Sequence, residues 1–143
     1  MGQIRIETKV TVTDDNGTVQ THSWDKTITS LSQIDVRQFS LVADATPTIW
    51  DPTVEATENP ADFDFLLLCS DGIVDAEFTC NEGDANEVIQ TRRLYAGVPY
   101  MLGADDSYYG ATGVLGGTLD VIDKIRLDEP ASAAKKVTVI MAT

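Results

Sequence analysis

The chain has 143 residues, 43% of them hydrophobic, which is the size and composition of one globular domain. Its 23 acidic residues outnumber its 10 Lys and Arg residues, so the formal net charge is −13 at pH 7. Direct binding to nucleic acid or to an anionic membrane is therefore disfavoured, because both require clustered cationic groups, whereas a partner with basic patches suits this charge.

The N-terminal segment alternates apolar and polar side chains, which is typical of a strand with one buried face. Asn16-Gly17 then predicts a tight turn, and residues 18–29 return with Trp24 and Ile28 as the expected core anchors. Residues 3–29 are thus predicted to form a long hairpin, which either extends from the core or mediates subunit contacts. The row that the pattern places on one face of the first strand is Ile4, Ile6, Thr8, Val10 and Val12.

The rest of the chain continues the same two-residue period, with turn-forming residues between the segments. Residues 63–70 are the most continuously apolar segment and are predicted to form a central strand covered on both faces. Residues 87–94 alternate weakly, with Val88 and Ile89 as candidate core residues. No segment has a convincing helical period. The remaining predicted strands are residues 37–44, 48–51, 74–81, 119–128 and 136–142.

About nine strands at near-regular spacing predict an all-β fold in a single domain, residues 1–143. Antiparallel β-sandwiches and jelly-roll-like folds both contain strands of this length and spacing. No apolar run approaches the roughly 18 residues that a membrane span needs, and the sequence shows no secretory signal. We therefore expect the chain to fold in a cytosol.

The two cysteines, Cys69 and Cys80, flank Asp71-Gly72, a dipeptide that favours a two-residue hairpin turn. In that hairpin Cys69 would face Val74 and Cys80 would face Phe63, so the two thiols would lie too far apart for a disulfide. A cytosolic compartment also keeps thiols reduced. Two free, buried cysteines are therefore predicted.

The sequence contains no pattern that indicates catalysis or cofactor binding. His22 is the only histidine, and no nucleophile with a neighbouring base accompanies it. A zinc site needs three or four His or Cys ligands, and glycine loops that bind phosphate have no counterpart in this sequence. We therefore expect no catalytic residue, no cofactor and no metal site of these classes. Two acidic pairs in predicted turns, Asp14-Asp15 and Asp105-Asp106, are candidates for binding a cation, with solvated turns as the alternative.

Four segments in the second half of the chain follow one another in a familiar order of strands and turns. They are residues 63–72 (FDFLLLCSDG), 96–103 (AGVPYMLG), 122–127 (IDKIRL) and 132–142 (SAAKKVTVIMA). This order resembles small virion structural proteins of tailed bacteriophages, particularly capsid auxiliary or decoration proteins with jelly-roll-like folds. The resemblance covers residues 63–143.

The resemblance implies a non-enzymatic virion protein, assembled in the host cytoplasm, that stabilises the head as a capsid decoration protein. It implies a homotrimer whose partner is the major capsid protein or another virion protein. A tail, baseplate or head-fibre structural protein is the alternative, and a carbohydrate-binding β-sandwich with Trp24, Trp50 and the tyrosines in a sugar platform is a more distant one. The residues expected at a subunit or capsid interface are Trp50, Tyr100, Tyr108 and Tyr109, for which packing within one subunit is the alternative.

Overall fold

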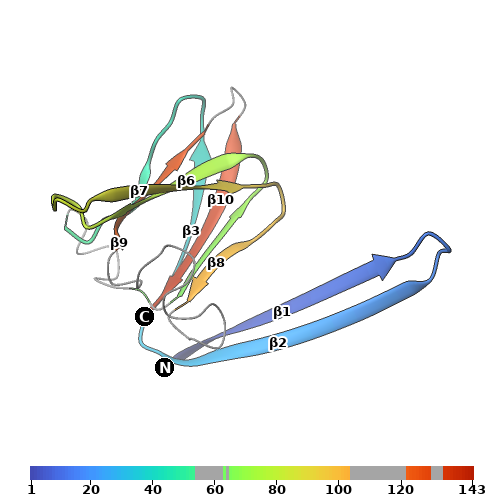
Figure 1. The fold of residues 1–143 in the computed structure, drawn as a ribbon. Coiled ribbons are helices and arrows are strands. Elements are labelled where there is room, and N and C mark those ends of the chain that lie inside the picture. The colour runs from blue at the N-terminus through green and yellow to red at the C-terminus, as the bar shows by residue number, and fades with distance from the viewer. Residues whose placement is uncertain (54–62, 64, 104–121, 130–133) are drawn as a thin grey trace. The chain divides into compact units, whose positions relative to one another are not determined.

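The alternation of side chains in the sequence becomes ten β-strands in the computed structural model, which describes residues 1–53, 63, 65–103, 122–129 and 134–143. These described residues contain no helix, and every pair of neighbouring strands is antiparallel, so the predicted all-β, antiparallel class is confirmed. The chain divides into two compact units, Met1–Gln33 and Ile34–Thr143, and Figure 1 shows the strands of each.

The first unit is a two-stranded ribbon of β1 (Gly2–Thr13) and β2 (Val19–Leu31). Its turn is organised by Asp14, whose Oδ1 accepts hydrogen bonds from the backbone N–H groups of Asn16 (2.9 Å) and Thr18 (2.8 Å). Gly17 adopts φ +79°, a left-handed conformation that glycine reaches without a steric penalty. The ribbon therefore has a tight turn that its own sequence specifies.

The second unit contains two four-stranded sheets. One has the order β3 (Ile34–Leu41), β10 (Lys135–Ala142), β5 (Phe65–Ser70) and β8 (Tyr100–Gly103). The other has the order β4 (Thr48–Trp50), β9 (Ile122–Asp128), β6 (Val74–Cys80) and β7 (Val88–Leu94).

The eight strands of this unit pair in a nested order. The first pairs with the last, β3 with β10, and the pairs β4 with β9, β5 with β8 and β6 with β7 lie inside it. Two further pairings, β10 with β5 and β9 with β6, join these pairs into the two sheets. The chain consequently crosses between the sheets at every link except the one from β6 to β7.

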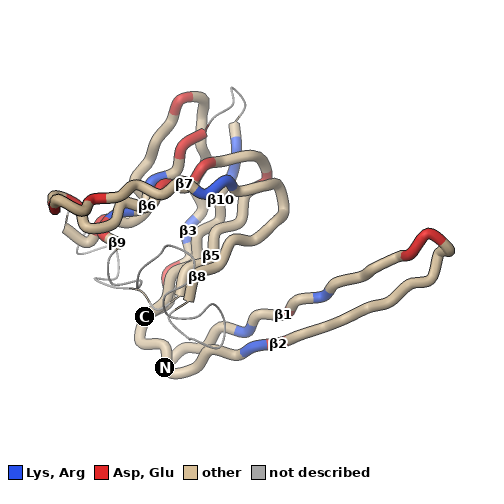
Figure 2. Tube along the Cα trace, in the orientation of Figure 1, with Lys and Arg blue, Asp and Glu red and all other residues tan. Residues whose placement is uncertain are grey.

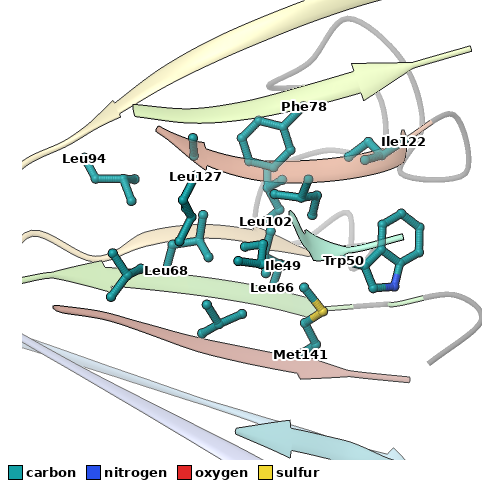
Figure 3. Packing of buried hydrophobic residues seen from close by; sticks show 14 of the residues in the cluster. Ile49, Trp50, Leu66, Leu68, Phe78, Leu94, Leu102, Ile122, Leu127 and Met141 are labelled. Atoms are coloured by element: carbon teal, nitrogen blue, oxygen red, sulfur yellow. The ribbon is translucent and has the colours of Figure 1, made fainter. Parts of the chain in front are cut away.

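The two sheets bury one hydrophobic core between them (Figure 3). Leu66 and Leu68 of β5 meet Phe78 of β6 and Leu127 of β9 in this core, and none of the four side chains retains exposed surface. Burial of an apolar side chain of this size stabilises a fold by about 1.5–3 kcal/mol. The period of two places these residues on the inner face of each sheet, because alternate side chains of a strand point to opposite sides.

The predicted central position of residues 63–70 is confirmed, since β5 lies between β10 and β8. The predicted hairpin between this strand and residues 74–81 is wrong, because β5 and β6 belong to different sheets. Asp71 holds the link to β10 instead: its carboxylate accepts the N–H of Lys136 (2.8 Å), and its own N–H donates to the Lys136 carbonyl (3.1 Å). Residues 71–73 therefore connect two layers, although Asp-Gly usually signals a hairpin.

Three residues expected in the core are exposed. Trp24 lies on the ribbon, which has no second layer of its own, and its side chain is 60% exposed. Val88 and Ile89 lie on β7, an edge strand, and both are exposed as well. The sequence pattern marks these positions as apolar but does not tell whether another layer covers them.

Both cysteines are free, as predicted, but the predicted burial is wrong for Cys69, which is half-buried; Cys80 is buried. The reason differs from the predicted hairpin register: Cys80 packs in the core between the sheets, whereas Cys69 alternates with the core residue Leu68 and lies on the outer face of β5. A sheet thus separates the two thiols. Burial, and secondarily the charge of Asp123, raise the pKa of the Cys80 thiol, which keeps it protonated and unreactive.

We expect the stability of the protein to be independent of reductant, because no disulfide joins Cys69 and Cys80. The urea midpoint of the wild type should be the same with and without dithiothreitol. A loss of about 2–5 kcal/mol on reduction, the typical effect of losing a native disulfide, would contradict the separation of the two thiols.

Candidate interaction surfaces

The described residues do not assemble a recognisable catalytic or metal-binding cluster. Within these residues no group of three His, Cys, Asp or Glu side chains is placed to hold a metal ion. His22 lies on the ribbon with its ring stacked on Trp24, with 6.0 Å between the ring centroids. Among all the residues that the structure describes, no helix is long and apolar enough to span a membrane.

Of the two acidic pairs predicted as cation sites, the structure describes only Asp14-Asp15. Asp14 uses its carboxylate to cap the ribbon turn, and the hydrogen bond from the Thr18 N–H, the largest influence, lowers the pKa of this carboxyl group. Burial opposes that effect, and the N–H of Asn16 adds to it. The pair Asp105-Asp106 lies outside the described residues. The geometry thus gives Asp14 a structural role in the turn.

Two of the predicted interface aromatics pack within the subunit. Trp50 is only 3% exposed and meets Phe63 edge to face, with 5.0 Å between the ring centroids. Tyr100 is half-buried beside Phe78, at 5.9 Å between centroids, and burial raises the pKa of its hydroxyl, with a smaller opposing effect of Arg92. Both side chains thus make contacts within the subunit, and their role at an interface stays a prediction.

Tyr108 and Tyr109, the other two predicted interface residues, lie outside the described residues. The predicted sugar platform also loses a member, because Trp50 is buried in the core whereas Trp24 is exposed on the ribbon. These two side chains cannot form one exposed aromatic surface.

One face of the ribbon is polar and pairs its own charges. The Arg5 guanidinium lies 3.1 Å from the Glu7 carboxylate and 3.4 Å from that of Asp25, and the Thr11 and Thr21 hydroxyls lie 3.5 Å apart. A depression of about 420 Å³ is lined mainly by residues of this face, together with Thr8 and Trp24 of the opposite face; the lining residues of the polar face are Arg5, Glu7, Lys9, Ser23 and Asp25. Exposed ion pairs of this kind contribute little stability and are typical of a solvated face.

The opposite face of the ribbon is largely apolar and exposed. Opposed residues of an antiparallel pair share a face, and the register pairs Thr8 with Trp24 and Val10 with His22. Val10 is 42% exposed, Val12 52% and Trp24 60%. We call this surface the apolar ribbon face; its residues are Ile4, Ile6, Thr8, Val10 and Val12 of β1 and Gln20, His22, Trp24, Lys26 and Ile28 of β2.

The outer face of the β4-β9-β6-β7 sheet is covered by ion pairs. Arg93 of β7 binds Asp75 of β6 through two hydrogen bonds, of 2.8 and 2.9 Å. Arg126 of β9 binds Glu77 of β6, with a distance of 3.2 Å from Nε to Oε2, and Lys124 of β9 binds Glu82. Figure 2 marks both basic and acidic positions on these strands. Such cross-strand pairs suit a surface that faces water.

The outer face of the β3-β10-β5-β8 sheet carries a row of apolar side chains. Ile140 of β10 stands opposite both Val36 of β3 and Leu67 of β5, and Leu67 stands opposite Met101 of β8, so one apolar row crosses all four strands. Val36 is 62% exposed, and the other three side chains are half-buried. We call this row the apolar sheet face. The sequence signal for it is the continuous run of apolar residues in β5, whose two faces are both apolar.

Comparisons of the chain with protein-family models, curated proteins and solved structures give no match.

The ion pair between Asp75 and Arg93 predicts a measurable acid dependence of stability. The hydrogen bonds from Arg93 are the largest cause of a lowered pKa of Asp75, against an opposing effect of burial. A lowered pKa in the folded state means that the pair stabilises the fold above the ordinary carboxyl pKa of about 4 and loses this effect as the pH falls through the lowered value.

We therefore expect Asp75→Asn to lower the free energy of unfolding by about 0.5–1 kcal/mol at pH 7, as for other partly exposed pairs. The difference between the variant and the wild type should shrink as the pH falls below 4, measured by urea titration at several pH values. Arg93→Met should reproduce the loss at pH 7. A difference that is equal at pH 7 and at pH 2.5 would contradict this role of the pair.

The buried position of Trp50 predicts a large effect on folding. Trp50→Ala should lower the free energy of unfolding by about 3–5 kcal/mol, because it leaves a cavity beside Phe63 in the core. Trp24→Ala, at the exposed tryptophan, is the matched control and should leave the unfolding transition of residues 34–143 within about 0.5 kcal/mol of the wild type. Equal effects of the two substitutions would contradict the different environments of the two rings.

Proposed function

We propose that the protein is a non-enzymatic structural component of a tailed-bacteriophage particle, and that it decorates the capsid. Under this proposal its partner is the major capsid protein, it acts as a homotrimer, and it resides in the virion after assembly in the host cytoplasm. The proposal joins the resemblance of residues 63–143 to virion proteins with three physical features of the described chain: the strand order, the distribution of charge and the contrast between the two outer faces of the sandwich.

The nested strand order supports the proposal at the level of architecture. We infer that the second unit is a jelly roll, because eight antiparallel strands that pair first with last, and so on inward, form one long hairpin wrapped into two sheets. Jelly rolls are frequent in viral capsid proteins and also occur in lectins and cupins. The architecture alone does not determine function, so the surfaces must decide between these classes.

The charge distribution supports a protein partner over nucleic acid. Residues 34–143 carry 19 acidic and 7 basic residues, a net charge of −12, whereas residues 1–33 carry four acidic and three basic residues, a net charge of −1. A body with this charge is repelled by phosphate backbones. It also keeps many closely spaced copies soluble, as a protein on the outside of a shell requires.

The observation that carries the proposal is the contrast between the two outer faces of the sandwich. One face is covered by ion pairs, including Asp75–Arg93, and suits contact with water. The other holds the apolar sheet face, with Val36 as its most exposed residue. Soluble monomers rarely leave a contiguous apolar patch on a sheet uncovered, and such patches mark protein contacts. A decoration protein needs this polarity, with one side for the shell and one for solvent.

Binding to capsids tests the proposal. Purified protein should co-sediment in a saturable manner with undecorated heads assembled from the major capsid protein of the same phage. Val36→Asp should weaken this binding at least tenfold, because it places a charge in the apolar sheet face. The matched control is Ile89→Asp: Ile89 is 57% exposed and β-branched, and it lies on the edge strand of the opposite, ion-paired sheet.

Each outcome of this experiment decides something. Saturable binding that Val36→Asp abolishes and Ile89→Asp leaves unchanged supports capsid decoration through the apolar sheet face. Equal effects of the two variants would reject this face as the contact. Binding to isolated tails or baseplates but not to heads would favour the tail, baseplate or head-fibre alternative. Binding to neither, together with a shift of Trp24 fluorescence on adding oligosaccharide, would favour a carbohydrate-binding module.

A further inference from the structure

The ribbon of β1 and β2 poses a physical problem that the second unit does not share. Two strands alone have no core, and an isolated two-stranded hairpin is marginally stable in water. This ribbon is nevertheless long, with 12 residues in β1 and 13 in β2. Within the described residues no third strand pairs with it. A second layer over one of its faces would supply the missing stabilisation.

The two faces of the ribbon differ in their need for such a layer. The polar face satisfies its charges internally, through Arg5 with Glu7 and Asp25. The apolar ribbon face exposes Val10, Val12 and Trp24 in place of polar groups. If this face stayed in water, the hydrophobic free energy of these side chains would be lost, at about 25 cal/mol per Å² of apolar surface.

The charges of the ribbon point to a second copy of the same chain as the occupant. The apolar ribbon face contains no acidic residue, and its only formal charge is that of Lys26. Glu7 and Asp25 lie on the polar face, and Asp14 and Asp15 lie in the turn. A chain with a net charge of −13 therefore keeps one of its surfaces free of acids. Two copies can meet through this surface without bringing like charges together.

The shape of the face also suits a second copy. The bulky Trp24 stands directly opposite the small Thr8, halfway between Ile4 and Val12 along β1. When two such faces pack about a twofold axis that runs along the strands, β1 of each copy covers β2 of the other, and the indole of each copy lies over the partner's Thr8 position. The large and small side chains are thus self-complementary, as an isologous interface requires.

We infer that copies of this chain associate through their apolar ribbon faces, which pack against one another as two β-layers. The inference goes beyond the proposed function: a twofold contact joins copies in pairs, so it is separate from the contacts that would form a homotrimer. From Ile4 to Val12 the face is about 27 Å long, and two strands are about 10 Å wide. At about 270 Å² per copy, this contact is well below the roughly 800 Å² per partner of a standard stable interface, so the association is weak, reversible and dependent on concentration.

The test measures the mass of the full chain by sedimentation equilibrium across a wide range of concentrations. The wild type should rise from 15.5 kDa towards a multiple of that mass as its concentration increases. Trp24 emission should shift to shorter wavelength over the same range, because Trp24 becomes buried. Trp50 is buried in the core of each copy and contributes a constant signal.

Two variants locate the contact. Val10→Thr with Val12→Thr keeps the branched shape and strand preference of the side chains but makes the apolar ribbon face more polar, and it should weaken the association at least tenfold. The matched control is Val19→Thr: Val19 is 60% exposed, on the same ribbon, but opposite Thr13 on the polar face. This control should change the association less than twofold. Urea unfolding followed through Trp50 verifies that residues 34–143 fold normally in each variant.

Three results would overturn the inference: a monomer at all concentrations, an oligomer whose mass the double variant leaves unchanged, or equal weakening by the double variant and by Val19→Thr. The measurement uses the protein alone, without any particle. A failure of capsid binding would therefore leave this inference intact. A monomeric protein that still binds heads would reject the inference and the homotrimer while supporting capsid decoration.

Discussion

A β-strand presents side chains on two sides, and the core of a two-sheet sandwich can cover only one of them. In residues 34–143 the two sheets enclose a core that includes Leu66, Phe78 and Leu127. Their two outer faces differ in chemical character. One sheet covers its outer face with cross-strand ion pairs. The other leaves a row of apolar side chains across four strands. Each sheet thus has one face outside the core, and the side chains on that face determine the chemistry of the surface.

The ribbon meets the same constraint without any core of its own. Its polar face carries ion pairs, and its apolar face exposes Val10, Val12 and Trp24. Each of the two units thus carries apolar surface that its own strands do not cover. Under the proposed function, these two surfaces are where the protein contacts other molecules or copies of itself.

The sequence pattern predicted where strands lie better than it predicted their partners. The period of two located the ribbon and the central strand β5, because it depends only on neighbouring residues. The pairing of β6 was not predicted, because Asp71-Gly72 has the local sequence of a hairpin turn. The hydrogen bonds of Asp71 instead reach Lys136, which is 65 residues away in the sequence. The exposure of Trp24 was not predicted for a related reason: the alternation of side chains marks an apolar row but does not show whether another layer covers it. The two apolar faces could therefore be identified only from the strand register in the structure.

The place of β10 between β3 and β5 has a consequence for the synthesis of the protein. Until residues 135–142 have left the ribosome, the β3-β10-β5-β8 sheet lacks an inner strand, and β3 and β5 have no neighbour on that side. Contacts between segments so distant in sequence form slowly, because the chain must first close a long loop. The nascent chain therefore exposes unpaired strand edges until these residues are available, and a high net negative charge is the kind of repulsion that opposes aggregation through such edges.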